Sequence, residues 1–540
     1  MTLRADPVPI PSRRVTYQKN RNGSVYVYLK LRSYRNKHGT PTSYIVAIGK
    51  KAPVSGMLIP NRRYFEFFPK ESDQHTRKNH DDSARGKLSV ASCGVVHCLR
   101  EIARCTGLEA ALCECFPECH NEILASAFYM VSEGNAMLYI EDWFDETGIK
   151  FSRRMDDRQC SRLFARLDEQ KCSQFYRIWV DRSKEHEYTA YDVTSISTYS
   201  KGIDLAEPGY NRDGEQLPQI NLAMFYGAES QLPLYFEVYN GSVNDMTRLK
   251  FTVDCANKLG VSRTKFVFDR GFVSTDNMSY MHSNGYRYVT AMRASQTETK
   301  RLIDECMADL RLSENRIPTA NVYAKSIPTE VCGFSTTAHV YWDVDKQAED
   351  TNEMFARIQQ LEARLKDMNK SKRVPSLYNA YFDVTQGQPG TVSYVLDNRK
   401  VDEHARRCGC FVLLTNDETL SSSEALSLYR WRDEIEKHFN QFKNGLEFKR
   451  LRTHINSTTD GKMFVGYIAL ILRSYLLRRI RDKFPKKKRM TVEKVLRELG
   501  KIKVIRFSDS TQLLTPITKL QRTILDALSL SVHGLQDATK

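Results

Sequence analysis

The 540-residue sequence contains no hydrophobic run long enough to cross a membrane. Its longest apolar stretch, FVGYIALIL at 464–472, is about half a membrane span and is followed by Arg473, which predicts a buried helix. No apolar segment follows the basic start MTLRADPVPIPSRR, so we expect no secretory signal and a soluble, intracellular protein. A chain of this length needs several hydrophobic cores, and we expect three or four domains.

The thirteen cysteines do not show the paired CxxC spacing that is typical of structural zinc sites. Several are concentrated between 93 and 119, where the segment ALCECFPECH ends in Cys119 and His120. Many of these fall at helical intervals within apolar text, where free cysteine behaves as a small hydrophobic residue. We therefore expect reduced thiols in a reducing compartment, and a zinc site is the less favoured alternative.

Acidic residues are scarce toward both ends of the chain. Residues 1–63 hold 13 Lys and Arg against a single acid, Asp6, and residues 441–510 hold 19 against 6. Because the net charge of the whole chain is only +16, the middle must be acidic. Basic ends around an acidic centre predict modules that bind a polyanion such as DNA on either side of a carboxylate-rich domain. Solvated basic faces are the plainer alternative.

Periodicity and turn residues divide the chain into regions. Alternating text near the start predicts two strands joined by a turn at 36–40, and this ribbon, which carries Arg32, Arg35 and Lys37, could lie on DNA. A helical unit follows, and then a domain in which strands and helices alternate. We expect a basic β-rich DNA-binding region at 1–90, a helical domain at 91–180 and the first part of an α/β core at 181–293. An inserted domain at 294–409, the second part of the core at 410–480 and a basic helical C-terminal region at 481–540 are expected to follow.

The alternating domain begins near residue 186 with three β-rich stretches. A helix at 245–260, the buried strand KFVFD, a short helix at 274–284 and the strand YRYVTAMR follow. This is the order of the ribonuclease H fold, a mixed sheet with helices on its faces. The next strong helix begins at Ser421, more than a hundred residues after Arg293. A structureless loop of that length is implausible in a compact domain, so we infer an inserted domain.

The helix that begins at Ser421 places three carboxylates close together. At about 100° per residue, a polar stripe about 60° wide contains Tyr429, Arg432, Glu436 and Lys443. An adjacent apolar stripe contains Leu428, Ile435, Phe439, Phe442 and Leu446. Asp433 has a cation one turn later and Glu434 points to the far side, so Glu436 is the carboxylate that we expect at the edge of a cleft. An ion pair of Glu436 within its own helix is the alternative.

Two further acids are expected near Glu436. Asp192 lies in the first strand of the alternating domain, and Asp269 ends the buried strand KFVFD. Sites in open α/β sheets form outside the carboxyl ends of strands, and a buried acid there is unfavourable unless it is paired or bound to metal. Three carboxylates form a hard oxygen site for Mg²⁺ or Mn²⁺, and two such ions could promote in-line attack on a phosphodiester. Asp181 and Asp204 are less favoured candidates for the first position, because each is expected at or beyond the edge of a strand.

The spacing of these residues resembles a family signature. Bacterial insertion-sequence transposases of the DDE type include an IS-four-like branch marked by the signature YREK, in which Tyr, Arg, Glu and Lys are separated by two, three and six residues. Here the signature falls on Tyr429, Arg432, Glu436 and Lys443. The segments YDVTSIS and FVFDRGF are similar to the regions around the first and second aspartates of the family.

The resemblance implies a ribonuclease H-like core with an insertion before the glutamate. The implied metal-binding catalytic triad, with two Mg²⁺ or Mn²⁺ ions, consists of Asp192, Asp269 and Glu436. The implied contacts with the DNA backbone come from Tyr429, Arg432 and Lys443. Such a transposase binds the inverted repeats of its element, cleaves the ends, joins the 3′-hydroxyls to target DNA as a dimer or larger assembly, and works in the bacterial cytoplasm at the nucleoid. A nuclease of the same fold and a non-catalytic DNA-binding protein are the alternatives.

Overall fold

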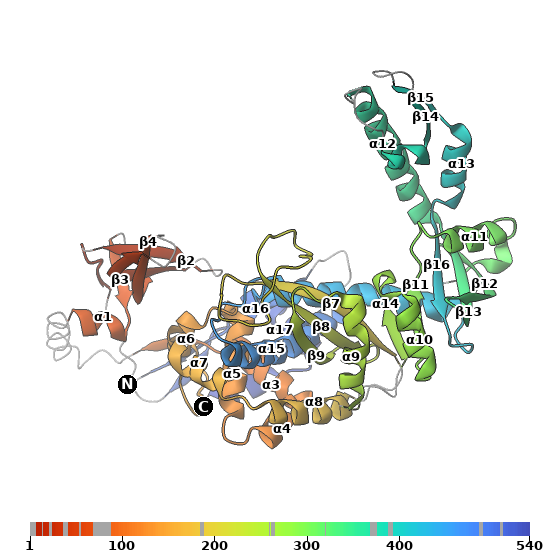
Figure 1. Ribbon diagram of the computed structural model, residues 1–540. Helices are drawn as coiled ribbons and strands as arrows, with labels where there is room; N and C mark the ends of the chain where they lie inside the picture. The colour runs from red at the N-terminus through yellow and green to blue at the C-terminus, as the bar shows by residue number, and fades with distance from the viewer. Residues whose placement is uncertain are drawn as a thin grey trace.

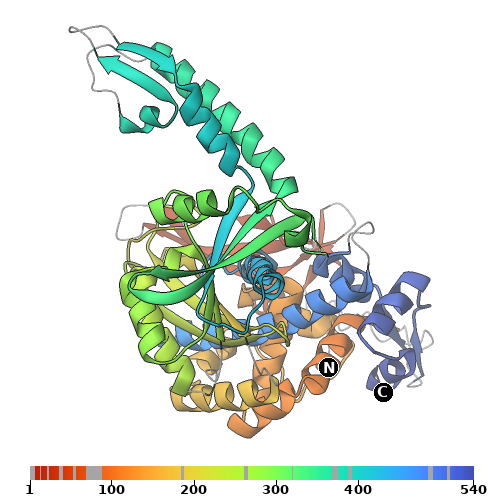
Figure 2. The same ribbon diagram turned by 90° about the vertical axis from the view of Figure 1, so that its right-hand side faces the viewer.

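The protein consists of a large α/β body, a small N-terminal β unit and an arm that projects away from the body (Figures 1 and 2). This computed structural model describes residues 7–12, 14–20, 24–35, 41–52, 56–68, 88–183, 188–258, 260, 265–318, 320–367, 375–386, 392–484, 490–507 and 511–539.

The body is built on an eight-stranded mixed sheet with the order β12-β13-β16-β11-β10-β7-β8-β9. The strands are β7 Tyr188–Ser197, β8 Gln219–Gly227, β9 Pro233–Asn240, β10 Lys265–Phe268, β11 Tyr288–Ala291, β12 Val322–Val331, β13 Phe334–Asp343 and β16 Cys410–Thr415. The first three strands are antiparallel, and β10 and β11 run parallel to β7. The predicted order of three strands, helix, strand, helix and strand is confirmed.

Helices cover both faces of this sheet (Figure 2). Every residue of β7 and β8 is buried, which is the pattern of strands in a sheet covered on both sides. On one face, α14 contacts β7, β10, β11, β12 and β16, and on the other α9 and α10 pack against each other. These helices and the short turns beside them are α9 Asp245–Lys258, η2 Arg270–Phe272, α10 Thr275–Ser283, α11 Thr297–Cys306, η3 Ser313–Asn315 and α14 Ser422–Asn440.

The region that was expected to be an inserted domain, 294–409, falls into two structurally different parts. Strands β12 and β13 form a hairpin, and β13 pairs with β16, so this part extends the central sheet. The projecting arm has a hydrophobic core of its own (Figure 1). It consists of α12 Val344–Asp367, η4 Ser376–Ala380, β14 Phe382–Gln386, β15 Val392–Leu396 and α13 Asn398–Arg407. Periodicity identifies a strand but not its partner, which is why the hairpin could not be assigned to the sheet from sequence.

A long central helix, α15 Asn456–Lys483, joins the sheet to the helical unit. It contains the apolar run at 464–472, which is buried as predicted, and it contacts α3, α5, α7 and β9. The helical unit consists of α3 Gly94–Cys105, α4 Leu108–Cys115, α5 His120–Glu133, η1 Met137–Tyr139, α6 Ile140–Glu146, α7 Asp157–Ala165 and α8 Glu169–Ser183. Among the described residues, no helix has the length and apolar content that a membrane crossing needs.

In the described part of the N-terminal unit, a five-stranded sheet with the order β1-β5-β4-β3-β2 is accompanied by one short helix. Its elements are β1 Val8–Pro9, β2 Val15–Lys19, β3 Val25–Arg35, β4 Pro41–Lys51, β5 Met57–Pro60 and α1 Arg62–Phe67. Tyr139 stacks on Tyr26 at a centroid distance of 4.4 Å and connects this unit to the helical one. Strands β3 and β4 match the predicted ribbon, whereas the turn at 36–40, which includes Lys37, and the side chains of Arg32 and Arg35 lie outside the described residues.

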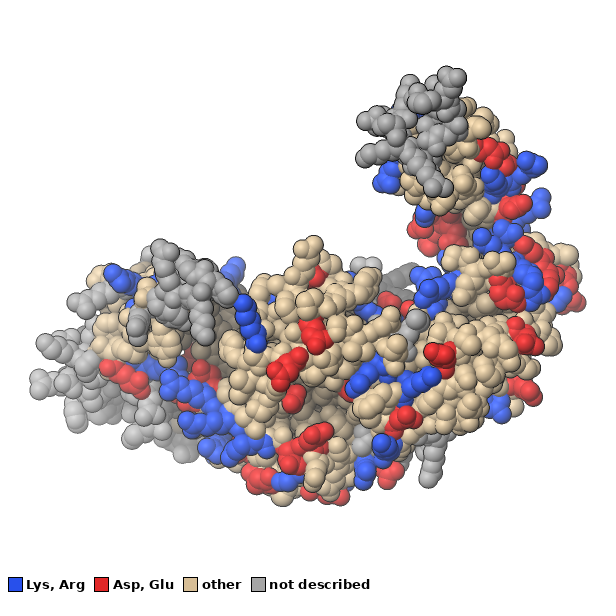
Figure 3. All heavy atoms as spheres, in the orientation of Figure 1, with Lys and Arg blue, Asp and Glu red and all other residues tan. Residues whose placement is uncertain are grey.

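The C-terminal region was expected to be helical, but it also contributes two strands. Strand β17 pairs with β18 and with β6, which lies just before the helical unit, so the two distant parts of the chain share a small sheet. The elements are β6 Ser89–Ser92, α16 Val492–Gly500, β17 Lys503–Arg506, β18 Gln512–Leu514, α17 Lys519–Ala527 and α18 Val532–Thr539. The basic run at 486–489 lies outside the described residues. Figure 3 shows Lys and Arg gathered on the body below the N-terminal sheet, whereas both signs of charge alternate on the arm.

The central helix contains a buried cation, and its protonation is expected to affect stability. Lys462 is 4% exposed and donates from Nζ to the Leu451 carbonyl at 3.0 Å, and burial lowers its pKa to about 7. Between that value and the ordinary lysine pKa, the unfolded chain binds a proton that the folded chain does not, so the free energy of unfolding rises with pH through this range. We predict that Lys462→Met raises Tm more at about pH 6 than at about pH 9.

Thermal unfolding monitored by circular dichroism tests this, with Lys449→Met as a control at an exposed position. An equal change in Tm at both pH values would show that Lys462 is not the titrating group.

Candidate active site

Asp192 lies in β7, and Asp269 directly follows the neighbouring parallel strand β10. The pairs Lys265 with Tyr188 and Val267 with Ala190 define the register between β10 and β7. Asp269 and Asp192 each lie two residues beyond the last of these pairs, and the Asp269 charge contributes to the raised pKa of Asp192, so the two carboxylates are close together. The structure therefore brings together two of the three predicted carboxylates.

Asp192 is a buried carboxylate, only 5% exposed. Its Oδ1 accepts from the Val193 N–H at 2.8 Å and faces Nη1 of Arg212 at 3.4 Å. Burial raises the pKa of Asp192, and the charges of Arg212 and Arg432 oppose that shift. A cation close to Asp192 therefore stabilises its ionised form.

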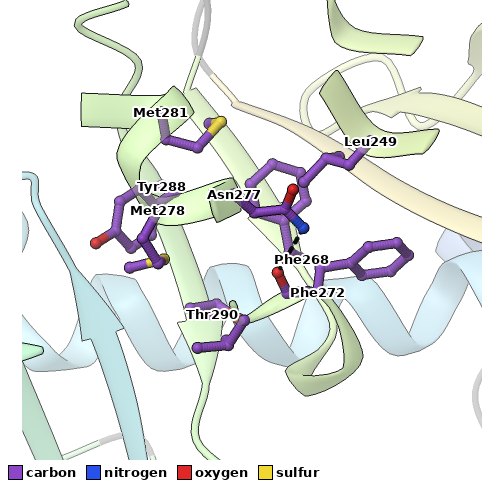
Figure 4. Close-up of a pocket in the computed structure, with 9 residues that line it drawn as sticks. Leu249, Phe268, Phe272, Asn277, Met278, Met281, Tyr288 and Thr290 are labelled. Carbon is purple, nitrogen blue, oxygen red and sulfur yellow. Dashed lines mark hydrogen bonds between the residues drawn. The ribbon is translucent and has the colours of Figure 1, made fainter. Parts of the chain in front are cut away.

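Asp269 lies at the end of β10, where the chain turns into Arg270–Phe272. Asn277 of α10 holds this turn by donating from Nδ2 to the Phe272 carbonyl at 3.0 Å (Figure 4). Beneath it, Phe268, Phe272 and Thr290 line a small apolar cavity. The Asp269 side chain remains 36% exposed, so the turn presents one accessible carboxylate beside the buried one.

Helix α14 begins as predicted and carries the signature residues to this edge. Ser421 and Glu424 form a reciprocal capping box at its start, and the predicted apolar stripe is buried or partly buried. Arg432 is 8% exposed, and its Nη1 lies 3.1 Å from Oδ1 of Asp269. Its guanidinium also lies over the Tyr429 ring, 5.0 Å from the centroid. Helix α14 is therefore attached to the Asp269 turn through Arg432.

Glu436 lies one turn beyond Arg432 and is exposed. Among the residues that the structure describes, no three His, Cys, Asp or Glu side chains come close enough together to hold a metal ion. The predicted three-carboxylate cluster is thus not assembled, because Arg432 rather than Glu436 lies against Asp269. The side chains of Asp433 and Glu434 lie outside the described residues.

Lys443 does not continue the regular helix that the angular prediction assumed. It lies in a π-turn, Gln441–Gly445, which adds a residue to the turn and shifts every later side chain around the axis. The buried guanidinium of Arg473 holds this turn through hydrogen bonds from Nε and Nη2 to Oε1 of Gln441, at 3.0 and 2.6 Å. A Cβ at Gly445 would lie 2.8 Å from Nε of Arg473, so a larger residue there would require this guanidinium to move.

The loop between β7 and β8 contributes residues that the sequence analysis did not single out. Asp213 accepts from Nζ of Lys443 at 2.7 Å, and the adjacent Arg212 faces Asp192. Burial lowers the pKa of Lys443, and the Asp213 carboxylate opposes that shift. Both pairs join residues far apart in the sequence, so no local pattern could have identified them.

The competing acids lie away from the two aspartates. Asp181 is exposed on helix α8 and not at a strand edge, and Asp204 accepts from Nδ2 of Asn456 at 2.7 Å. The cysteines are free thiols, and burial raises the pKa of Cys98 above the ordinary range. Within the described ranges they form no group of three or more that could hold a metal ion.

Comparison with known proteins identifies the family. Residues 183–472, more than half of the chain, match the family model described as "Transposase DDE domain". The chain belongs to the DDE transposase family. The match covers β7 to β16, α14 and part of α15, and therefore both aspartates and the signature helix.

No curated protein matches this transposase. Among solved structures, the chain is similar to piggyBac transposase in a synaptic complex with hairpin DNA, at 10% sequence identity, over 77% of this chain and 72% of that chain. The TM-score is 0.33, and we draw no conclusion from a likeness at this level.

The donor atoms at the two aspartates suit a divalent metal ion, as expected for DDE transposases. Carboxylate oxygens are the ligands that Mg²⁺ and Mn²⁺ prefer. Asp192 and Asp269 supply such oxygens close together, and each faces a guanidinium, from Arg212 and Arg432. A cation beside Asp192 offsets the desolvation of its buried charge.

Asp192 is expected to reduce the stability of the protein in a buffer that contains EDTA. Because its pKa is raised in the folded state, the folded chain binds more protons than the unfolded chain above the ordinary aspartate pKa, and stability falls as pH rises through that range. We predict that Asp192→Asn raises Tm by a few degrees at about pH 8 and by less at about pH 5.

Differential scanning fluorimetry at the two pH values measures this difference, and Asp204→Asn is the matched control at an exposed position. A lower Tm for Asp192→Asn at both values would contradict the assigned burial penalty.

Proposed function

We propose that this transposase has a ribonuclease H-like catalytic core and cuts DNA at the terminal inverted repeats of its own insertion sequence by metal-dependent hydrolysis. It then joins the freed 3′-hydroxyls to target DNA. The observation that carries the proposal is the closeness of Asp192, in β7, to Asp269, which follows the parallel strand β10, within the matched transposase domain. The strand order β9-β8-β7-β10-β11, with the first three antiparallel, supports the assignment of the core.

In this mechanism Asp192, Asp269 and Glu436 would hold Mg²⁺ or Mn²⁺, two ions in all. When bound, the ions would supply activation of the attacking oxygen and stabilisation of the leaving oxygen of the phosphodiester. Asp192 is fixed by its strand and by the Val193 N–H, whereas Asp269 is on a turn held by α10. Arg432 and Glu436 are one helical turn apart on the same side of α14. In the proposed mechanism the Arg432 side chain moves away from Asp269, and Glu436 then takes part in the site.

Tyr429, Arg432 and Lys443 are proposed to contact the DNA backbone next to the scissile phosphate. Arg432 and Lys443 are 8% and 7% exposed, and both are paired with carboxylates, Asp269 and Asp213. A phosphate replaces these carboxylates as the partner of each cation. The basic N-terminal sheet is proposed to bind the repeats as well, and the active assembly on DNA is proposed to be a dimer or larger.

Loss of one triad carboxylate is expected to abolish cleavage. With Mg²⁺ and a duplex that carries the repeats flanking the coding region, Asp192→Asn, Asp269→Asn and Glu436→Gln should each reduce the nicking rate by more than about 1,000-fold. Asp204→Asn changes an exposed carboxylate outside the site and should retain the wild-type rate. If the Glu436→Gln variant nicks DNA at the wild-type rate, the assignment of Glu436 to the active site is wrong.

Joining distinguishes a transposase from a nuclease of the same fold. Duplexes with pre-cut ends and free 3′-hydroxyls should be inserted into a supercoiled plasmid in the presence of Mg²⁺, because the same ions activate a hydroxyl or a water molecule. The measurement is the appearance of labelled end DNA in the plasmid band. Cleavage without any joined product would favour the nuclease.

A further inference from the structure

The loop between β7 and β8 carries an unusual set of charges beside the candidate active site. Within five residues it supplies one cation to a catalytic-site aspartate and two carboxylates to cations of the segment that follows Glu436. The three pairs are Arg212 with Asp192, Asp213 with Lys443, and Glu215 with Arg450. The positive charge of Arg212 beside Asp192 has the sign of a metal ion. The negative charges of Asp213 and Glu215 have the sign of phosphates, so the loop carries the same charges as DNA and its bound metal.

The side chain of Asn211 holds the backbone of this loop in position. Asn211 accepts at Oδ1 from the N–H groups of Asp213 and Glu215, at 2.8 and 3.3 Å, and donates from Nδ2 to Oγ of Ser197 at 3.0 Å. These bonds fix the backbone that carries Asp213 and Glu215.

Arg450 has the geometry of an anion-binding site. Its Nη1 lies 2.7 Å from Oε2 of Glu215 and its Nη2 donates to Oε1 at 2.8 Å, which is a two-point contact. A guanidinium binds two phosphate oxygens with the same geometry. The Tyr199 ring lies against this guanidinium, with Cζ 5.3 Å from the ring centroid, and Tyr199 is 74% exposed. Proteins that bind single strands combine cations for the phosphates with exposed aromatic rings on which bases stack.

The backbone around Arg450 is fixed from two sides. The Leu451 N–H donates to the Ser197 carbonyl at 3.4 Å, at the end of β7, and Asn135 donates from Nδ2 to the Arg450 carbonyl at 3.1 Å. Ser197 is five residues beyond Asp192 on the same strand, about 16 Å away. Arg450 is thus a fixed cation within a few nucleotides of the place where the phosphodiester would be cut.

We propose that Arg450 and Tyr199 form a nucleotide-binding site for the DNA strand that enters the active site, and that Glu215 occupies the phosphate position until DNA binds. The phosphate lies in the guanidinium fork, and the base or sugar packs on the open face of Tyr199. This inference rests on the proposed function and adds two residues outside the YREK signature to the DNA-binding surface.

Glu215 leaves Arg450 only when another anion competes for the guanidinium, and not because the Glu215 carboxylate becomes protonated. The Arg450 guanidinium and the Ser197 hydroxyl hold the pKa of Glu215 below its ordinary value, so it stays ionised under working conditions. Only another anion can take its place. Removing the carboxylate by Glu215→Gln should therefore strengthen DNA binding, whereas a purely structural ion pair predicts no gain or a loss.

The test measures binding of the full-length protein to a fluorescein-labelled duplex with a short 3′ single-stranded overhang, in EDTA, by fluorescence anisotropy over a range of KCl concentrations. The Kd of the Glu215→Gln variant should be about fivefold lower than the Kd of the Glu118→Gln variant. Glu118 forms an exposed ion pair with Lys171 at 2.6 Å on the helical unit, so both variants add one positive charge and remove one ion pair.

Arg450→Gln should weaken binding and reduce the salt slope by about one, and Glu215→Gln should bring no gain in that background. Tyr199→Ala should remove the preference for the overhang over a blunt duplex, and Tyr199→Phe should retain it. Equal gains for Glu215→Gln and Glu118→Gln, or a gain that persists with Arg450→Gln, would overturn this inference alone. A wild-type protein that binds no DNA would overturn the proposed function with it.

Discussion

The parallel pairing of β7 with β10 is the constraint on which the candidate site depends. It sets two carboxylates close together, one buried and one at the surface. Like charges at this separation raise the free energy of both unless cations lie close by. The surrounding elements supply those cations, Arg212 from the β7–β8 loop and Arg432 from α14. The guanidinium groups reduce the repulsion between the two carboxylates. A divalent ion would reduce the same repulsion, which makes the site suitable for such an ion.

Helix α14 is held at its start, at Arg430 and at the π-turn that follows it, so Glu436 lies on a helix with fixed ends. A capping box fixes its start, and Arg430 pairs with Asp343 at 2.7 Å at the end of β13. At the other end, Arg473 of α15 holds the π-turn and also reaches Glu493 of the C-terminal region. The helical unit, the sheet and the C-terminal region therefore meet at the end of the signature helix. A movement of any of them changes where Lys443 lies.

Local patterns in the sequence predicted the elements well and their partners poorly. The start of the helix at Ser421, the buried apolar stripe and the order of strands and helices follow from periodicity and turn residues, and the structure confirms them. The pairing of β13 with β16 and the strands β17 and β18 were missed because pairing joins distant segments. The π-turn was missed because its cause is Arg473, whose contact with Gln441 is tertiary. The resemblance to DDE transposases covered what local patterns could not, and the family match confirms it at that level.

The central claim is that Asp192, Asp269 and Glu436 surround one metal centre in the DNA complex. Its most direct measurement replaces Mg²⁺ by Fe²⁺ in the complex with end DNA and adds ascorbate and peroxide, so that hydroxyl radicals cut the chain next to the bound ion. The account predicts cuts close to all three residues, suppressed by excess Mg²⁺. Cuts beside the two aspartates and none near Glu436 would contradict it.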